Sequence, residues 1–321
     1  MYTENSKKIR DNNILNKEDI FDFEFSPHKD RFNDVYLKIH NIFTYEARNY
    51  NIENPIILFE NNFSVNARAR YSKGYNVILI NSGTIVWLVE NIIENEKLIK
   101  FNKLYNQAFS KIQFFNFQEL IFQINILFTF HHEFAHLIQN SNQSFNWMNE
   151  QVIDSNYSIQ KHSLEIDADT YSAIQIARHL IQYYEKDFKN YGINFLEFIT
   201  IVLGANLFFY ISAFGNSNKK LHYYENSHPH PFIRVMRVIF TVGKYYEDDK
   251  EINLTKTNIV EKMINEIFVL QNAYTTNNLP LFKEEISNNY LDIFNYLQEI
   301  SDYETTKINS AVEIYNRVMA D

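Results

Sequence analysis

Glycine and proline, the residues that most often interrupt helices and form tight turns, are scarce in this chain: six Gly and five Pro stand among its 321 residues. Average usage of the two residues is about 7% and 5%. Such a composition favours long helices joined by few sharp turns. We therefore predict an α+β fold that is mainly helical.

Strand character is confined to one early stretch of the sequence. Ile56 to Phe59 is a short apolar run, and Phe63 to Tyr71 alternates apolar with polar residues. Ser72-Lys73-Gly74 predicts a turn, and Tyr75 to Ile80 predicts the returning strand. We expect a small twisted sheet here, followed by a helix over Thr84 to Lys100.

Segments with helical apolar spacing make up most of the remaining chain. We predict helices over Phe101–Phe109, Gln118–Asn140, Ser163–Tyr184 and Phe195–Phe214, and several amphipathic helices from Pro231 to the end. The chain then divides into a lead-in of residues 1–50, a central domain of residues 51–240 and a helical segment of residues 241–321 that packs on the core.

Residues 198–214 are uncharged and raise the question of a membrane span. Seventeen residues only reach the lower limit for crossing a bilayer, and Gly204, Asn206 and Ser212 interrupt the apolar run. We expect a buried core helix and no membrane span. A peptidase anchored in a membrane by this helix is the alternative.

Charge and cysteine content exclude several classes of function. Lys and Arg total 30 against 39 Asp and Glu, a net charge of −9, which argues against direct binding of nucleic acid because phosphate needs a basic face. The chain has no Cys, so a metal would have to use the ten His and the carboxylates. The start has no apolar signal region, so we expect a cytoplasmic protein.

The strongest motif is His132-Glu133-Phe134-Ala135-His136. Side chains four positions apart share a helix face, so His132 and His136 can present their imidazoles to one metal ion, with Glu133 beside it. Asn125 and Thr129 continue this face as a polar stripe on an otherwise apolar helix. Such a stripe is costly unless it lines a cleft or finds partners. Two buried histidines with ordinary hydrogen-bond partners are the alternative interpretation.

A hydrolytic zinc site needs a third protein ligand, which we place at Glu165. Glu165 and Asp169 lie four residues apart on the next predicted helix, so one can bind the metal while the other accepts the free ring N–H of a ligating His. Asp167 points to another face, and we expect a solvated carboxylate there. His162, one turn before Glu165, is the competing third ligand, since three His also make a zinc site.

A third cluster, Ser227-His228-Pro229-His230-Pro231-Phe232-Ile233-Arg234, forms a rigid loop that enters a helix. His228 and Arg234 could stabilise an oxyanion or orient a substrate carbonyl. His230 leaves open which of the two His faces the metal. A stiff loop with exposed His is the structural alternative.

Together, in this order, His132-Glu133-x-x-His136, Glu165-x-x-Ala168-Asp169 and His228-Pro229-x-x-x-x-Arg234 resemble the three motifs of gluzincin metallopeptidases of the Ste24 and HtpX type. The doubled His131-His132 resembles the phage-exclusion (Lit-type) peptidase family more closely still. The resemblance covers roughly residues 55–240.

The resemblance implies a zincin-like catalytic domain with one Zn²⁺ per chain, held by His132, His136 and Glu165. It implies Glu133 as general base, Asp169 as support for a ligating His, and His228 and Arg234 as further catalytic and supporting groups. Lit-type peptidases cut translation elongation factor Tu during phage infection, so this factor is the implied protein substrate. In related peptidases the substrate pairs with an edge strand, for which we choose Tyr75 to Ile80. The oxyanion needs a donor besides the metal, and His228, Arg234 and Tyr224 are the candidates.

Three functional hypotheses follow. The first is a soluble zinc endopeptidase that acts on an intracellular protein and depends on an activator, with a terminal segment of the chain as the gate. The second is a repressor-cleaving regulatory peptidase, although the chain lacks the basic character of a DNA-binding module. The third is a catalytically inactive zinc-binding scaffold that binds other proteins. Retention of Glu133 favours an enzyme.

Overall fold

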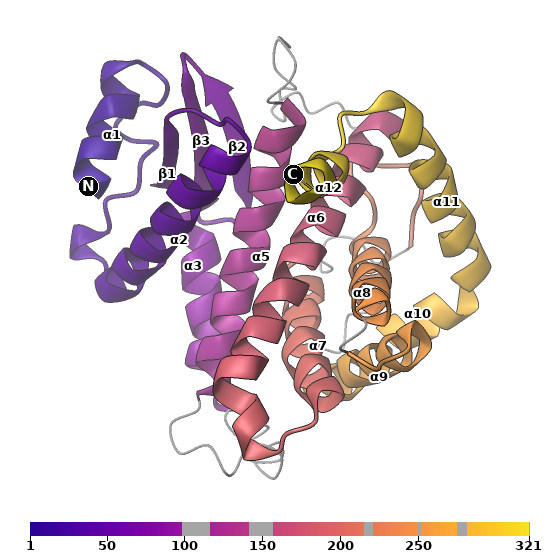
Figure 1. Cartoon of the computed structure of the whole chain (residues 1–321). Helices are drawn as coiled ribbons and strands as arrows, with labels where there is room; N and C mark the ends of the chain where they lie inside the picture. The colour runs from indigo at the N-terminus through magenta and orange to yellow at the C-terminus, as the bar shows by residue number, and fades with distance from the viewer. Residues whose placement is uncertain (98–115, 141–156, 215–220, 250–251, 275–280, 321) are drawn as a thin grey trace.

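The computed structural model describes residues 1–97, 116–140, 157–214, 221–249, 252–274 and 281–320. Its architecture is α+β and mainly helical with one small sheet, which confirms the prediction from composition. The sheet lies toward the N-terminal side, and the long helices that follow it pack beside it and beyond it (Figure 1).

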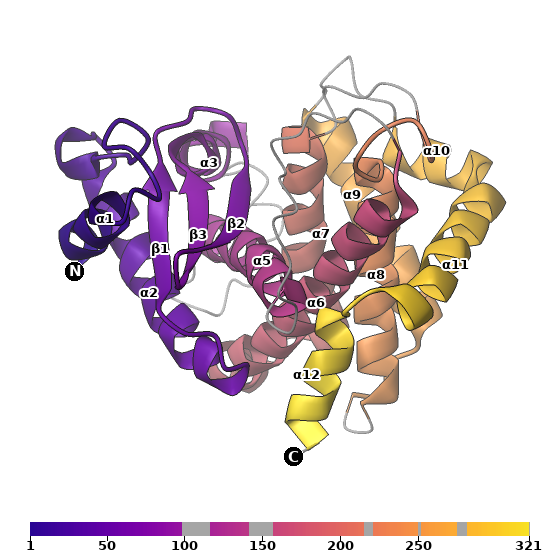
Figure 2. The same ribbon diagram turned by 90° about the horizontal axis from the view of Figure 1, so that it is seen from above.

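The sheet has three strands, β1 (Pro55–Glu60), β2 (Ala67–Ser72) and β3 (Tyr75–Asn81), in the spatial order β1-β3-β2. β2 and β3 form a hairpin whose two turn residues, Lys73 and Gly74, have φ of 50° and 83°, the left-handed pair that a two-residue hairpin turn needs. β1 pairs with β3 in parallel. β3 is therefore central, and the prediction that Tyr75 to Ile80 is an edge strand is wrong: β2 is the edge strand next to the long helices (Figure 2).

Both faces of the sheet are covered. One face, with Ile56, Leu58, Val77 and Leu79, packs against α1 (Tyr2–Asp11) and the segment after it. The other face packs into the main core with α2 (Lys29–Asn49) and α5 (Phe117–Asn140). Successive side chains of a strand point to opposite faces, and β1 and β3 have apolar residues at four successive positions, so both faces of the sheet are apolar.

The segment after the sheet forms a shorter helix than predicted. α3 (Ser82–Leu88) continues through a π-helical turn, Val89–Ile93, and the helix ends there. The remainder of the predicted Thr84–Lys100 helix runs into residues 98–115, and the predicted helix Phe101–Phe109 also lies outside the described residues.

The core of the helical part is the pair α5 and α6 (Ile159–Tyr183), which lie side by side (Figures 1 and 2). α5 is buried on nearly all sides because helices and the sheet surround it. The helices that complete the fold are α7 (Phe195–Phe214), α8 (Pro231–Asp248), α9 (Lys256–Tyr274), α10 (Phe282–Asn288), α11 (Tyr290–Lys307) and α12 (Ala311–Ala320), with short turns at Phe23–Phe25, Tyr184–Phe188 and Lys189–Tyr191.

α7 is the one helix among the described residues that is long and apolar enough to cross a membrane. Its most apolar 18-residue window is 72% buried inside the protein. It packs against α5, α8 and α9, and its side chains from Phe198 to Ala205 are buried.

Candidate metal centre

His132 and His136 lie on one face of α5, as the four-residue spacing predicts. Their Nε2 atoms are 3.2 Å apart, and both rings are largely shielded from solvent. The polar side chains that precede them on this face donate hydrogen bonds to backbone carbonyls one turn earlier in the helix. Asn125 donates to the carbonyl of Ile121, and Thr129 donates to the carbonyl of Asn125. The polar stripe can therefore lie on a buried helix without losing hydrogen bonds.

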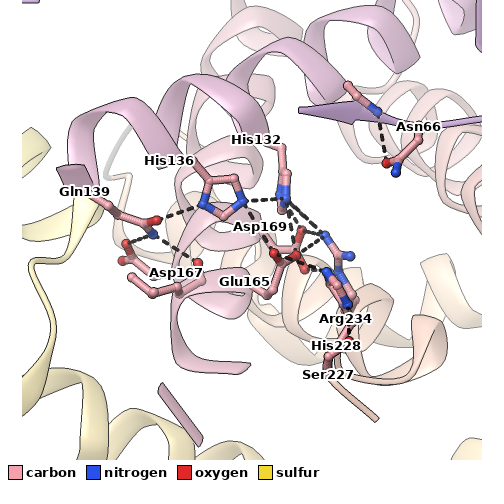
Figure 3. Close-up of polar contacts among 12 residues, drawn as sticks. Asn66, His132, His136, Gln139, Glu165, Asp167, Asp169, Ser227, His228 and Arg234 are labelled. Carbon is pink, nitrogen blue, oxygen red and sulfur yellow. Dashed lines mark hydrogen bonds and ion pairs between the residues drawn. The ribbon is translucent and has the colours of Figure 1, made fainter. Parts of the chain in front are cut away.

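Glu165 approaches the two imidazoles from α6. Its carboxylate oxygens lie 3.4 Å from His132 Nε2 and 3.5 Å from His136 Nε2. The three residues offer one ligand atom each, all within 4.8 Å of one another, and they could hold a metal ion. Figure 3 shows the three side chains converging from α5 and α6.

Asp169 orients His132. Its Oδ1 lies 3.0 Å from His132 Nδ1, and a carboxylate can only accept, so Nδ1 carries a proton and Nε2, which faces Glu165 and His136, is the nitrogen available to a metal. Burial alone would lower the pKa of His132, but the hydrogen bonds to Asp169 and Glu165 outweigh it and raise that pKa. Asp169 thus makes the ring a better donor of its lone pair.

Arg234 of α8 is ion-paired with two carboxylates of α6. Its guanidinium binds Asp169 through two hydrogen bonds, of 2.7 and 2.8 Å, and lies 3.3 Å from Glu165. Burial alone would raise the pKa of Glu165 and of Asp169, but the charge of Arg234 and the hydrogen bonds at the site hold both pKa values below their ordinary ones. Arg234 is 14% exposed and is fully engaged in these contacts, which suit a supporting role.

The charges of the site suit a bound cation. Glu165 and Asp169 are ionised, Arg234 supplies one positive charge, and Glu133 adds a third carboxylate at 6% exposure. Glu165, Asp169 and Arg234 together carry one net negative charge, which a bound cation would offset. Buried charge is tolerated only when it is paired or bound to a metal.

A cleft of about 190 Å³ opens beside this group. His132, Glu133, Glu165 and Arg234 line its polar side. A second wall is formed by Ala67, the first residue of β2, and by Asn66 before it. The third wall is an apolar surface of helix side chains: Trp87, Leu88, Phe128, Leu207, Phe209 and Phe214. The cleft therefore joins the candidate metal ligands, Glu133 and the edge strand of the sheet.

His228 and His230 have different surroundings. His228 lines the cleft, with its Nε2 3.8 Å from a Glu165 oxygen and its side chain 57% exposed. His230 is buried, and its ring accepts a hydrogen bond of 3.1 Å from the backbone N–H of Phe232, which caps the start of α8. His228 is thus the histidine of this loop that faces the ligand group.

His162, the competing third ligand, is occupied elsewhere. It is fully buried, with Nε2 donating to the carbonyl of Asn226 at 2.8 Å and Nδ1 bonded to the hydroxyl of Tyr296. It is not part of the ligand group found among the described residues. It joins α6 to the loop before α8 and to α11.

Tyr224 does not reach the cleft. Its hydroxyl donates to Glu299 at 2.8 Å, and the side chain is 49% exposed. Tyr224 is not among the residues that line the cleft, so the structure does not support it as an oxyanion donor. His131, which precedes the motif, turns away from the ligands and lies 3.2 Å from His179 of α6.

Two residues at the site contradict or escape the sequence interpretation. Asp167 was expected to be solvated, but it is 2% exposed and accepts hydrogen bonds from Gln139 and from the start of α12. Gln139, which sequence reasoning missed, lies 2.8 Å from His136 Nδ1. Its place one turn after His136 on the same helix is the signal that could have identified it.

Comparisons with protein families, curated proteins and solved structures find no match for this chain. The resemblance to metallopeptidases is therefore carried by three short motifs. In the fold, residues from all three motifs meet at one cleft: His132 and Glu133 from α5, Glu165 from α6, His228 from the loop before α8 and Arg234 from α8.

Proposed function

We propose that this chain is a zinc-dependent endopeptidase with a zincin-like catalytic domain. The observation that carries the proposal is the convergence of His132, His136 and Glu165 beside a cleft that Glu133 lines and that reaches the edge strand of the sheet. Two His and one carboxylate are a ligand set of hydrolytic zinc enzymes, which leaves a position for water. The same donors can bind manganese, cobalt or nickel. Zinc is preferred because it matches the geometry of hydrolytic sites and is more available.

A zinc ion held by these residues would polarise the scissile carbonyl and lower the pKa of a bound water to about 7. Glu133 lies at the cleft, where it can take the proton from the attacking water and return it to the leaving amine. His228 lines the same cleft and can donate a hydrogen bond to the oxyanion. Asp169 and Arg234 hold His132 and Glu165 in place.

The edge strand supports a protein substrate. Ala67, the first residue of β2, and Asn66 before it line the cleft, so an extended peptide can add to the sheet at β2 and pass over Glu133. The apolar wall, which includes Trp87 and Phe209, can take an apolar side chain of that peptide. Main-chain pairing of this kind binds peptides with varied side chains.

The proposed biological role is that of a phage-exclusion or abortive-infection effector, with elongation factor Tu as the first substrate to test. This follows from the resemblance of the motifs to Lit-type peptidases. Regulation by an activator belongs to the same proposal, because a free protease would damage the cytoplasm in which we place the protein.

The test is zinc-dependent cleavage in a bacterial lysate, which contains elongation factor Tu and can be prepared from phage-infected cells to supply an activator. New protein N-termini are identified by mass spectrometry after addition of zinc-loaded protein. We expect termini that disappear when the metal is chelated and return when zinc is restored. A zinc-loaded protein that generates no new termini in either lysate would overturn the proposal and leave a zinc-binding scaffold.

A further inference from the structure

Gln139 lies between a candidate metal ligand and a buried carboxylate. Its side-chain oxygen is 2.8 Å from His136 Nδ1, and its side-chain nitrogen donates to Asp167 at 2.8 Å and to the carbonyl of Leu164 at 3.0 Å. Gln139 is 4% exposed. Figure 3 shows the three side chains, His136, Gln139 and Asp167, in this order.

This arrangement fixes the tautomer of His136. The nitrogen end of the Gln139 amide faces two groups that can only accept, so the amide cannot be reversed and its oxygen must face the imidazole. That oxygen needs a donor, so Nδ1 of His136 carries the proton and Nε2 keeps the lone pair. Gln139 therefore does for His136 what Asp169 does for His132.

Asp167 in turn is held by the C-terminal part of the chain. It accepts hydrogen bonds from the Ser310 hydroxyl at 2.6 Å and from the backbone N–H groups of Ala311 at 2.7 Å and Val312 at 3.4 Å. N–H groups in the first turn of a helix have no partner within the helix, and a negative charge there is stabilising, so Asp167 satisfies the start of α12. Asn309 donates to the carbonyl of Gln139 at 2.8 Å, a second link to the same turn of α5.

The sequence of this segment favours the docked geometry. Ser310-Ala311-Val312-Glu313 has the pattern of a helix-capping box, and the Ser310 oxygen accepts a hydrogen bond of 3.2 Å from the N–H of Glu313. The same hydroxyl donates its proton to Asp167. One serine therefore starts α12 and ties it to α6.

We propose that residues 309–312 support metal binding through their contacts with Asp167 and Gln139. They hold Asp167, Asp167 holds Gln139, and Gln139 orients His136, so metal binding and docking of α12 are coupled. Gln139 and Asp167 are positioning residues in this proposal. The inference rests on the metal site of the proposed function and adds a control point some 170 residues away in the sequence.

The coupling has a measurable consequence in each direction, because a coupling free energy between two sites is reciprocal. Loss of the hydrogen bond to His136 weakens metal binding, and metal binding strengthens docking of α12. A clamp that merely joins α5, α6 and α12 would produce neither effect.

The first experiment measures zinc affinity by competition with a chromophoric chelator. Gln139→Leu is expected to bind zinc about 10–100-fold more weakly than the natural chain, the usual effect of losing a hydrogen-bond partner of a metal ligand. It is also expected to shift the visible spectrum of the cobalt-substituted protein. Gln123→Leu, a partly buried glutamine on the same helix that contacts Lys38 and Glu119, is the matched control and should leave the affinity unchanged. Equal affinity in Gln139→Leu and the control would overturn the proposal.

The second experiment needs no variant and measures hydrogen exchange of the natural chain with and without zinc. Zinc is expected to slow exchange of the Ala311 and Val312 amides, while exchange of the amides of Met263 and Ile267, buried residues of α9, stays constant. An exchange rate of the Ala311 amide that is the same with and without zinc would also overturn the coupling. Neither readout involves hydrolysis, so a protein that binds zinc with this coupling but cleaves nothing would refute only the peptidase.

Discussion

Replacing Glu133 with glutamine is expected to lower the rate of peptide hydrolysis by about 10²–10⁴-fold, the usual contribution of a general base, while zinc stays bound. Glu133 lines the cleft, but the ligand group consists of His132, His136 and Glu165. The amide has nearly the shape of the carboxylate and cannot take a proton from water. The measurement is the initial cleavage rate at equal zinc occupancy.

Glu119→Gln is the matched control for Glu133→Gln. Glu119 is a glutamate at the start of the same helix, ion-paired with Arg31 at 2.8 Å, and it does not line the cleft. We expect cleavage by this variant to match that of the natural chain. If Glu133→Gln cleaved as fast as this control, Glu133 could not be the base.

Replacing Arg234 with leucine is expected to lower the free energy of unfolding of the metal-free protein by about 3–5 kcal/mol, as when one partner of a buried ion pair is removed. Asp169 is 1% exposed and Glu165 is 9% exposed, so their charges would lose their counter-ion without gaining water. Urea unfolding of the metal-free protein measures the loss. Added zinc is expected to recover part of it, because the ion supplies the missing positive charge.

Arg237→Leu provides the comparison one turn further along α8. Arg237 donates to the Thr170 hydroxyl at 2.9 Å and lies 3.8 Å from Glu304. Burial raises the pKa of Glu304 to about 7, so this carboxyl can take a proton near neutral pH when its partner is removed. We expect a loss of about 1 kcal/mol, as for an ordinary hydrogen bond. Equal losses in the two arginine variants would contradict the role of Arg234 as counter-ion of the site.

The ligand group could be predicted because it depends on helix periodicity. His132 and His136, like Glu165 and Asp169, are four residues apart, and a helix places such pairs on one face whatever surrounds it. The sequence already favoured Glu165 over His162 as the third ligand, but the partners of His162 could be seen only in the fold. Only the loop before α8, which brings the Asn226 carbonyl to His162, shows that this imidazole is already engaged.

The order of the strands could not be predicted from the local pattern. The turn at Lys73-Gly74 predicts that β2 and β3 are neighbours, but the parallel pairing of β1 with β3 depends on packing across the sheet. That pairing makes β3 central and β2 the edge strand at the cleft.

The partners of Asp167 could not be predicted from the pattern of α6 alone. On α6 alone, Asp167 points away from Glu165, which suggested solvent. In the fold, that direction is occupied by Gln139 and the start of α12, which is distant in sequence. A pattern within one helix gives the direction of a side chain but not the partner that it meets.

The metal content of the purified natural chain tests the central claim most directly, measured beside Glu165→Ala and His162→Ala. We expect about one zinc per chain in the natural protein and in His162→Ala, and a large loss in Glu165→Ala, because a site with two ligands holds zinc poorly. A natural chain that takes up no zinc when the ion is supplied would contradict the metal centre, and zinc that remained in Glu165→Ala but was lost in His162→Ala would contradict the ligand set.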